Sequence, residues 1–215
     1  MVESVGGDAS WNLAMRLEGE VVVLEPLEAS HGQGLHAAGQ AEEIWTWWPL
    51  DPTESRATTR RWIDGCLAAA ERGERQHYAT LDAGTGAVIG STSYCLIQPE
   101  HKVVEIGWTW LAPSYWGTGA NVEAKLLMLR HAFDVLGCQR VQLVTDARNE
   151  RSRAAIEALP AQFEGVHRDD RIVRDGVRRS SAYYSILDSE WPDVRRCLVN
   201  RLERSRLSGS SPPQA

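Results

Sequence analysis

The sequence lacks the cysteine spacing of a disulfide framework or a zinc site. Its 215 residues hold four scattered cysteines and no Cys-x-x-Cys pair. His77, His101 and His167 also show no metal-ligand spacing, so they are interpreted as structural or surface residues. We therefore expect reduced thiols in a cytoplasmic protein, and no metal site. The cysteines are Cys66, Cys95, Cys138 and Cys197.

Long apolar runs and an excess of positive charge are also missing. No N-terminal apolar stretch follows a basic segment, so no signal peptide is predicted, and no run approaches the roughly 20 residues of a membrane span. The net charge of -6 argues against broad binding to nucleic acid. What is present, 43% hydrophobic and 24% charged residues, is typical of a globular protein with one well-buried domain.

The two ends of the chain differ in composition from the rest. Residues 1–10 are mostly small and polar, and the stretch "LSGSSPPQA" from Leu207 is rich in serine and proline. No internal repeat is visible. We expect a flexible tail over residues 1–14, a single domain with a C-terminal helix over 15–206, and a disordered tail over 207–215.

Strand and helix patterns alternate between these ends. This order predicts an α/β fold in which the middle of the sheet contains parallel strands. Strands are expected at residues 16–26, 76–82, 87–97, 102–113 and 139–146, followed by two strands around the turn "RDG" within 161–187. Helices are expected at 30–45, at 53–73 with Thr53 as its cap, after Gly119, at 149–159 and at 188–204.

The helix after Gly119 has the clearest pattern. Apolar residues recur at spacings of three and four, and Gly137 ends the run, which predicts one core-facing stripe. Glu123, Lys125 and Arg130 fall off that stripe. The stripe consists of Val122, Leu126, Leu129, Phe133 and Leu136.

Two glycines, Gly117 and Gly119, stand at the start of this helix in the segment "WGTGAN". A helix N-terminus has unpaired N–H groups, and glycines let an anion such as a phosphate approach them. The other interpretation is a plain strand-to-helix turn. The spacing matches neither G-x-G-x-x-G nor G-x-x-x-x-G-K-[ST], which disfavours a dinucleotide fold or a P-loop.

Three separated segments together resemble the GCN5-related N-acetyltransferase (GNAT) superfamily, and within it the RimJ/RimL-like branch of ribosomal-protein acetyltransferases. They are "VEIGWTWLAPSYWGTGANVEAKLLMLRHAFDVLG", "VQLVTDARNERSRAAIEAL" and "FEGVHRDDRIVRDGVRRSSAYYSI". The resemblance covers Leu17 to Trp191. The superfamily loop [QR]-x-x-G-x-[GA] falls on Trp116 to Asn121, where Trp116 replaces Gln or Arg and Asn121 replaces the final small residue. The implied fold is a mixed, twisted sheet of six to seven strands, splayed between the fourth and fifth and flanked by helices.

The resemblance implies a bacterial enzyme that uses acetyl-CoA as acetyl donor. Backbone N–H groups of the glycine loop would hold the pyrophosphate, the strand before it would pair with the pantetheine arm, and two polar residues of the next helix would lie near the thiol. The implied cofactor-binding residues are Trp108, Thr109, Trp110, Leu111, Trp116, Gly117, Thr118, Gly119, Ala120, Asn121, Val122, Asn149 and Ser152.

Acetyl transfer to an amine needs few catalytic groups. The amine must be neutral to attack, the oxyanion needs donors such as backbone N–H groups, and the thiolate needs a proton. Glu105 is the candidate base, acting through water, although it also fits a salt-bridged or solvated strand carboxylate. Ser152 is the candidate acid or else a first-turn serine, and Asn149 is a positioning residue that also fits a helix cap.

The acceptor side is less defined. In this superfamily the loop after the first helix walls the acceptor site, so Trp45, Trp47 and Trp48 are candidate substrate contacts, with core packing expected for at least one of them. The arginines of "RDDRIVRDGVRR" alternate with aspartates, which favours a solvated hairpin, although they could touch an acidic acceptor or the cofactor's 3′-phosphate. No cysteine lies beside a histidine in a matched motif, so direct transfer is favoured over an acyl-enzyme.

Two function classes remain. One is an N-acetyltransferase acting on a protein N-terminus or a small-molecule amine; the other is a non-catalytic acyl-CoA-binding domain that serves as a sensor or interaction module. The joint presence of Glu105, Asn149 and Ser152 favours the enzyme. No DNA or membrane partner is expected. The terminal helix, with Trp191 and Leu198, offers a surface for a homodimer.

Overall fold

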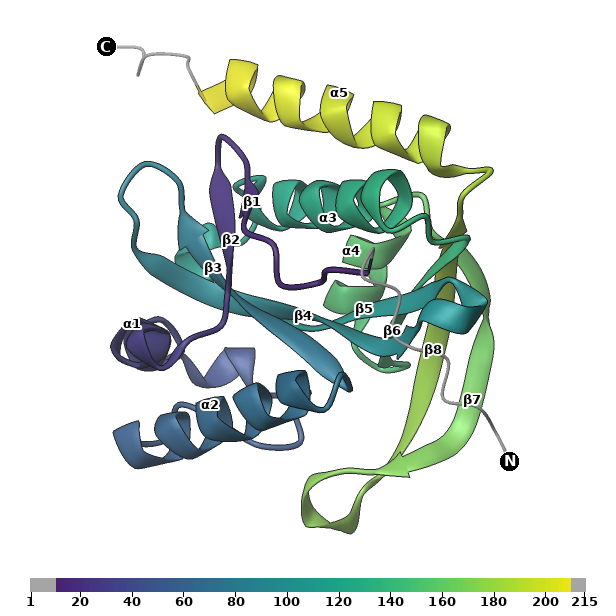
Figure 1. Ribbon diagram of the computed structural model, residues 1–215. Helices are drawn as coiled ribbons and strands as arrows, with labels where there is room; N and C mark the ends of the chain where they lie inside the picture. Colours follow the sequence, from purple (N-terminus) through teal and green to yellow (C-terminus); the bar gives the residue numbers. More distant parts are fainter. Residues whose placement is uncertain (1–10, 210–215) are drawn as a thin grey trace.

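A mixed sheet of eight strands runs through the protein in this computed structural model, which describes residues 11–209 (Figure 1). The strand order is β1-β2-β3-β4-β5-β6-β8-β7. Neighbouring strands are antiparallel except β5 and β6, which are parallel. The strands are β1 (Leu17–Glu18), β2 (Val22–Pro26), β3 (Arg75–Asp82), β4 (Val88–Gln98), β5 (Val103–Leu111), β6 (Arg140–Asp146), β7 (Gln162–Ile172) and β8 (Arg178–Leu187).

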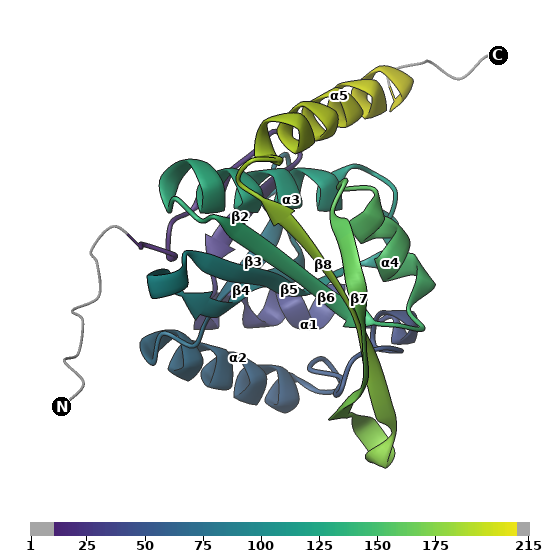
Figure 2. The same cartoon turned by 90° about the vertical axis from the view of Figure 1, so that its right-hand side faces the viewer.

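Helices cover both faces of this sheet (Figures 1 and 2). Helices α1 and α2 lie over one face and α3 and α4 over the other, while α5 lies on the outer side of α3. Each face therefore has its own apolar cluster. The helices are α1 (Gly32–Ala38), α2 (Arg56–Glu71), α3 (Ala120–Arg130), α4 (Glu150–Glu157) and α5 (Trp191–Gly209), with 3₁₀ turns at Ala29–His31, Glu42–Ile44, Pro99–His101, Pro113–Tyr115 and Arg174–Gly176 and a π-helical turn at His131–Val135.

The α/β fold predicted from the sequence is confirmed, with one strand more than expected. The predicted strand 16–26 is interrupted and forms β1 and β2. At the interruption, Glu123 of α3 accepts hydrogen bonds from the backbone N–H groups of Glu20, Val21 and Val22 at 3.1, 2.6 and 2.7 Å. A carboxylate that satisfies three consecutive donors holds the turn in place.

The sequence predicted that α3 is amphipathic, and the structure shows that it is not. Glu123 and Lys125 are only 4% and 5% exposed, whereas Arg130 is exposed. The reason is that the sheet, the N-terminal strands and α5 surround the helix, so that off-stripe positions also meet protein (Figure 1). Both buried charges have polar partners, as burial of charge requires.

Helix α2 begins two residues later than Thr53 would place it. Its cap is Ser55, whose hydroxyl accepts from the N–H of Thr58 at 3.1 Å. Thr53 instead donates its hydroxyl to the carbonyl of Gly39 at 2.7 Å. The segment 30–45, expected as one weak helix, is divided into α1 and two short 3₁₀ turns.

The described ends of the chain pack against the domain. Trp11 and Leu13 contact the main apolar cluster, and α5 continues to Gly209, past the predicted boundary at residue 206. The remainder of the predicted tails, residues 1–10 and 210–215, lies outside the described residues. Trp191 and Leu198 are buried within this chain, so they cannot provide the dimer surface proposed for them.

Strands β5 and β6 separate partway along their length. They pair only from Val103 to Glu105 on β5 and from Arg140 to Gln142 on β6. Beyond Glu105 and Gln142 the two strands diverge and leave a fork between them. This confirms the predicted splay between the fourth and fifth strands, which are β5 and β6 in the structure because the predicted first strand forms both β1 and β2. A parallel sheet opened in this way exposes backbone groups on both sides of the gap.

Candidate active site

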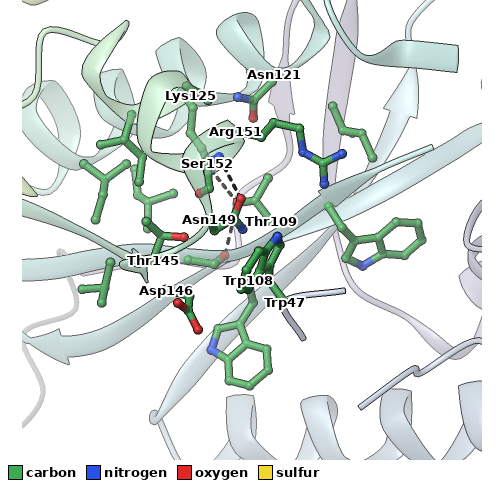
Figure 3. A pocket seen from close by; sticks show the side chains of 18 of the residues that line it. Trp47, Trp108, Thr109, Asn121, Lys125, Thr145, Asp146, Asn149, Arg151 and Ser152 are labelled. Atoms are coloured by element: carbon green, nitrogen blue, oxygen red, sulfur yellow. Dashed lines mark hydrogen bonds between the residues drawn. The ribbon is translucent and has the colours of Figure 1, made fainter. Parts of the chain in front are cut away.

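A cavity of about 580 Å³ lies at this fork. Its walls come from both splayed strands, the N-terminus of α3, helix α4, the β7–β8 hairpin and the loop around Trp47 (Figure 3). The cavity gathers nearly all the residues that the sequence singled out. Of the predicted site residues, Thr118, Ala120 and Trp45 do not line it.

The glycine loop adopts backbone conformations that favour glycine. Gly117 has φ +78° and Gly119, the residue that caps α3, has φ +92°. Gly119 has no side chain with which to cap the helix, although the N–H of Ala120 donates to the Thr118 hydroxyl at 3.4 Å. A Cβ placed on Gly117 would meet no protein atom within 4 Å. In the first turn, Oδ1 of Asn121 is buried in the cavity wall without a hydrogen-bond partner. The start of α3 is therefore a pre-formed polar cradle.

Trp116 is held in place despite its departure from the family pattern. Its indole Nε1 donates to the carbonyl of Leu111 at 2.9 Å. The guanidinium carbon of Arg151, on α4, lies 3.8 Å from the centre of the Trp116 ring. Arg151, which the sequence analysis did not select, thus supplies a positive charge beside a loop that has lost its usual Gln or Arg.

A β-bulge shapes the cavity wall on β5. Ser93 pairs with Gly107 and Ser91 with Trp110, so that Trp108 and Thr109 together face one residue of β4. Trp108 has φ +51°, an uncommon value for a residue other than glycine. Bulges of this kind redirect backbone and side chains at functional sites. Here the bulge turns the strand toward the fork.

Glu105 occupies the last paired position before the fork and lines the cavity. Its Oε2 accepts from Nε2 of Gln142 at 2.9 Å, and its Oε1 accepts from Sγ of Cys95 at 3.4 Å. No salt bridge involves Glu105 within residues 11–209, which disfavours the salt-bridged alternative. A half-buried carboxylate without a cationic partner can accept a proton from a group in the cavity.

Asn149 and Ser152 lie together at the start of α4 (Figure 3). Oδ1 of Asn149 accepts from the N–H of Ser152 at 3.0 Å, which confirms the predicted helix cap. The Ser152 hydroxyl makes no hydrogen bond with the part of the chain that the structure describes, and it lines the cavity. It is therefore free to bond with a ligand.

The three tryptophans of the loop have different environments. Trp45 is buried, with Nε1 donating to the carbonyl of Gly39 at 2.8 Å, so it is a core residue and not the substrate contact expected for it. Trp47 and Trp48 line the cavity. Trp48 contacts the Trp108 ring edge-to-face, with ring centres 5.2 Å apart, so the indoles of Trp48 and Trp108 form one aromatic wall.

Lys125 is a site residue that the sequence analysis missed. Its Nζ donates to the hydroxyl of Thr109 at 2.6 Å and to that of Thr92 at 3.3 Å, and the residue lines the cavity (Figure 3). Burial lowers the pKa of Lys125 to about 7. The lysine was unpredictable because a single helical stripe assigned it to the polar side.

Asp146, at the end of β6, is a second missed residue. It is buried at the cavity wall and accepts from Arg148 at 3.0 and 2.8 Å. Burial alone would raise the pKa of Asp146, but the hydrogen bonds and charge of Arg148 outweigh it and lower the pKa. Asp146 is thus held as a carboxylate and is already paired.

Residues 11–209 contain no group of three or more His, Cys, Asp or Glu side chains arranged to hold a metal ion. None of the helices within that range is both long and apolar enough to cross a membrane.

Comparison with known proteins supports the resemblance found in the sequence. The family model described as "Acetyltransferase (GNAT) domain" matches residues 22–162. The chain is 32% identical to the "Putative ribosomal N-acetyltransferase YdaF" of Bacillus subtilis over 54% of this chain and 66% of that protein. Both results agree with the predicted RimJ/RimL-like branch.

Solved structures give the same result. A GCN5-related N-acetyltransferase from Brucella melitensis is 33% identical, with a TM-score of 0.82 over 88% of this chain and 86% of that one. RimJ of Mycobacterium smegmatis, solved in complex with CoA-disulfide, shares the fold at 20% identity, with a TM-score of 0.75 over 89% of this chain and 96% of that one. The chain therefore belongs to the GNAT family of acetyltransferases.

Proposed function

We propose that this protein is an acetyl-CoA-dependent N-acetyltransferase that moves an acetyl group to a primary amine by direct attack on the thioester. One observation carries the proposal. A single cavity connects the N-terminus of α3 with the fork at which Glu105 lies. A helix start that suits an anion and a carboxylate without a described cationic partner, both lining one cavity, suit a phosphate-bearing donor and an amine acceptor.

The cavity residues fit a CoA thioester. Gly117 leaves open space where a Cβ would point, and the buried Oδ1 of Asn121 is an acceptor that can receive a hydrogen bond from an N–H or O–H group of the pantetheine arm. In our proposal, backbone N–H groups from Gly117 to Val122 hold the pyrophosphate, and β5 from Trp108 to Leu111 pairs with the pantetheine arm. The Mycobacterium smegmatis RimJ complex with CoA-disulfide has the same fold, which supports this choice of donor. Acetyl-CoA supplies the activated acetyl group.

The chain's own residues then handle protons and charge. Glu105 takes the proton of the amine through a water molecule, which makes the amine nucleophilic. Backbone N–H groups at the Trp108–Thr109 bulge donate to the carbonyl oxygen as negative charge develops on it. Ser152 gives a proton to the departing sulfur, and Asn149 fixes the start of the helix that carries Ser152.

The acceptor is an amine of a protein N-terminus or of a small molecule. Trp48 and Trp108 form an aromatic wall, and Trp47 lines the same cavity, so an apolar or cationic acceptor can lie against these indoles. YdaF carries a ribosomal N-acetyltransferase name, which supports testing N-terminal peptides of ribosomal proteins first.

The test is a thiol-release assay with acetyl-CoA against a panel of amines and N-terminal peptides, with each product identified by mass. We expect acceptor-dependent CoA release and a product heavier by one acetyl group. Tight acetyl-CoA binding without transfer to any acceptor would instead support the non-catalytic acyl-CoA-binding module. Absence of acetyl-CoA binding would overturn both.

A further inference from the structure

Arg179 of β8 lies at the end of the cavity formed by the β7–β8 hairpin. Its partner across the hairpin is Arg171, and both arginines line the cavity. The hairpin extends beyond the rest of the sheet (Figure 2). β6 ends opposite Ser181, so Arg179 stands two positions beyond the last residue of β8 that β6 covers. An arginine pair therefore faces the open part of the site.

The guanidinium of Arg179 has no partner of its own. Its Nε is buried without a hydrogen-bond acceptor, and none of the side chains that the structure describes joins the guanidinium by a salt bridge or a hydrogen bond. Burial, together with the like charge of Arg171, lowers the pKa of Arg179. Buried polar atoms are normally satisfied, so the Nε of Arg179 is a donor in the cavity wall that is available to a ligand atom.

The carboxylates near Arg179 already have other donors. Asp146 binds Arg148, and Glu105 accepts from Gln142. Asp170 pairs with Arg171 through Nε at 3.5 Å. These carboxylates act on Arg179 through their charge but make no direct contact with it. A negative group brought into the cavity would meet a donor that no protein group uses.

We propose that the acceptor carries a carboxylate close to its amine, and that Arg179 binds this carboxylate. This inference rests on the proposed function and names its substrate class. Guanidinium binds carboxylate through two parallel hydrogen bonds, which would place the neighbouring amine by geometry rather than by charge alone. Glu105 and Arg179 line the same cavity of about 580 Å³, so one small molecule can offer its amine to the first and its carboxylate to the second.

The carboxylate has two sources that share this chemistry. It is either the α-carboxylate of a free amino acid or an acidic side chain near a peptide N-terminus. The experiment compares alanine with alaninamide and peptides beginning Ala-Asp with peptides beginning Ala-Asn. Each pair is assayed with the wild type, Arg179→Met and Arg178→Met. Arg178 is the matched control because its side chain is 76% exposed and pairs with Asp169 outside the cavity.

The wild type should prefer the carboxylate member of at least one pair by about 10- to 100-fold in kcat/KM, the scale of one charge-assisted pair. Arg179→Met should abolish that preference, mainly through KM, while Arg178→Met keeps it. For each pair, the ratio of kcat/KM for the carboxylate member to kcat/KM for the amide member is compared between the wild type and the variant. This comparison cancels differences in the intrinsic reactivity of the amines. Thermal unfolding should show that Arg179→Met is folded, because it removes an unpaired buried charge.

Two results would overturn the inference. One is acetylation in which neither pair shows a preference; the other is a preference that Arg179→Met retains. If no amine is acetylated at all, the proposed function fails, and calorimetry still decides the inference. Alanine is then titrated into protein saturated with CoA, and heat that does not depend on Arg179 counts against the carboxylate site.

Discussion

Gln142 donates a hydrogen bond to Glu105 across the last paired position of β5 and β6, at 2.9 Å. The bond joins the two strands at the point where they separate. It also fixes one carboxylate oxygen, while the other accepts from the Cys95 thiol. Burial raises the pKa of that thiol, so it remains a protonated donor at neutral pH. Glu105 is thus oriented by neutral donors, and its negative charge is left for the cavity.

Replacing Glu105 by Gln should separate proton transfer from binding. The amide has nearly the same size and can still accept from Gln142, so acetyl-CoA affinity and the unfolding temperature should stay near wild type. The rate at neutral pH should fall by roughly 10²-fold or more, the usual scale for a lost general base. Part of it should return at high pH, where more of the amine is neutral. Rates across pH with an acceptor from the screen measure this.

Glu164→Gln is the matched control, because Glu164 pairs with Arg140 and does not line the cavity. It should leave the pH profile unchanged. A Glu105→Gln variant that turns over as fast as wild type at neutral pH would remove Glu105 from the mechanism. A variant that fails to fold would show that the carboxylate mainly holds the fork together.

Gly117→Ala tests the cradle at the start of α3. At φ +78° the substitution costs about 1–2 kcal/mol of unfolding free energy, because alanine disfavours left-handed backbone. The new methyl meets no protein atom within 4 Å, and because Gly117 lines the cavity we expect the methyl to meet the bound cofactor. Acetyl-CoA affinity, measured by calorimetry, should therefore fall by roughly tenfold or more.

Gly73→Ala is the control, because it introduces similar backbone strain at a residue that does not line the cavity. Gly73 has φ +68°, follows α2 and also has open space at its Cβ. The two variants should lose similar stability, and only Gly117→Ala should lose affinity. If both variants keep the wild-type affinity for acetyl-CoA, Gly117 serves only the geometry of the turn.

The sequence predicted the parts of this site that depend on backbone pattern. The loop from Trp116 to Asn121 and the cap at Asn149 were found because glycine and asparagine are local signals with a fixed place on a helix. The fork at Glu105 came from the resemblance to a family. None of these predictions required knowledge of long-range packing.

The missed residues depend on packing between distant segments. Lys125 was assigned to a polar face because helical periodicity cannot show that a helix is covered on every side. Trp45 and Trp47 are two residues apart in the same loop, yet one enters the core and the other the cavity. Arg179 was one of several arginines in a polar hairpin, and its unsatisfied Nε depends on which residues surround it.

Lys125 should make the stability of the protein depend on pH. The pKa of a lysine side chain is ordinarily 10.5, and that of Lys125 is about 7 in the folded protein because burial disfavours the charge. Between these values the unfolded chain binds a proton that the folded chain lacks, so the unfolding free energy rises with pH. The rise is about 1.4 kcal/mol per pH unit at most. Urea unfolding from pH 7.5 to 9.5 should show it in the wild type relative to Lys125→Met.

The chain has only two lysines, so NMR of labelled lysine provides a direct check. Lys102 is exposed, and Lys102→Met serves both as the assignment variant and as the stability control. Thr92 and Thr109 are also hydrogen-bonded to each other at 2.7 Å, so we expect their hydroxyls to stay paired when Lys125 is replaced. Parallel pH profiles for wild type and Lys125→Met would contradict the lowered pKa.

Glu123→Gln should be strongly destabilising although it changes one atom. The carboxylate accepts from three backbone N–H groups at the β1–β2 turn, and an amide presents its own donors to some of them. We expect a loss of about 2–4 kcal/mol in unfolding free energy, measured by denaturant titration. Glu43→Gln, at an exposed position, should change it little. A loss below about 1 kcal/mol would mean that the turn forms without this carboxylate.

Asn149 and Ser152 can be separated by three substitutions. Asn149→Ala removes the cap of α4 and should cost about 1 kcal/mol of stability, whereas Asn149→Asp keeps the cap acceptor and should restore it. Ser152→Ala should leave stability unchanged, because its hydroxyl bonds to none of the described side chains or backbone groups. Its turnover should still fall about tenfold or more if that hydroxyl protonates the departing sulfur.

The measurements are thermal unfolding and kcat with the acceptor found by the screen. A cap acts on activity only through the position of the helix, so Asn149→Asp should recover activity together with stability. If Asn149→Asp is stable but inactive, the amide itself contacts the substrates. If Ser152→Ala keeps full kcat at neutral pH, the sulfur leaves as a thiolate without help, which its low basicity permits, and Ser152 is a first-turn serine of α4.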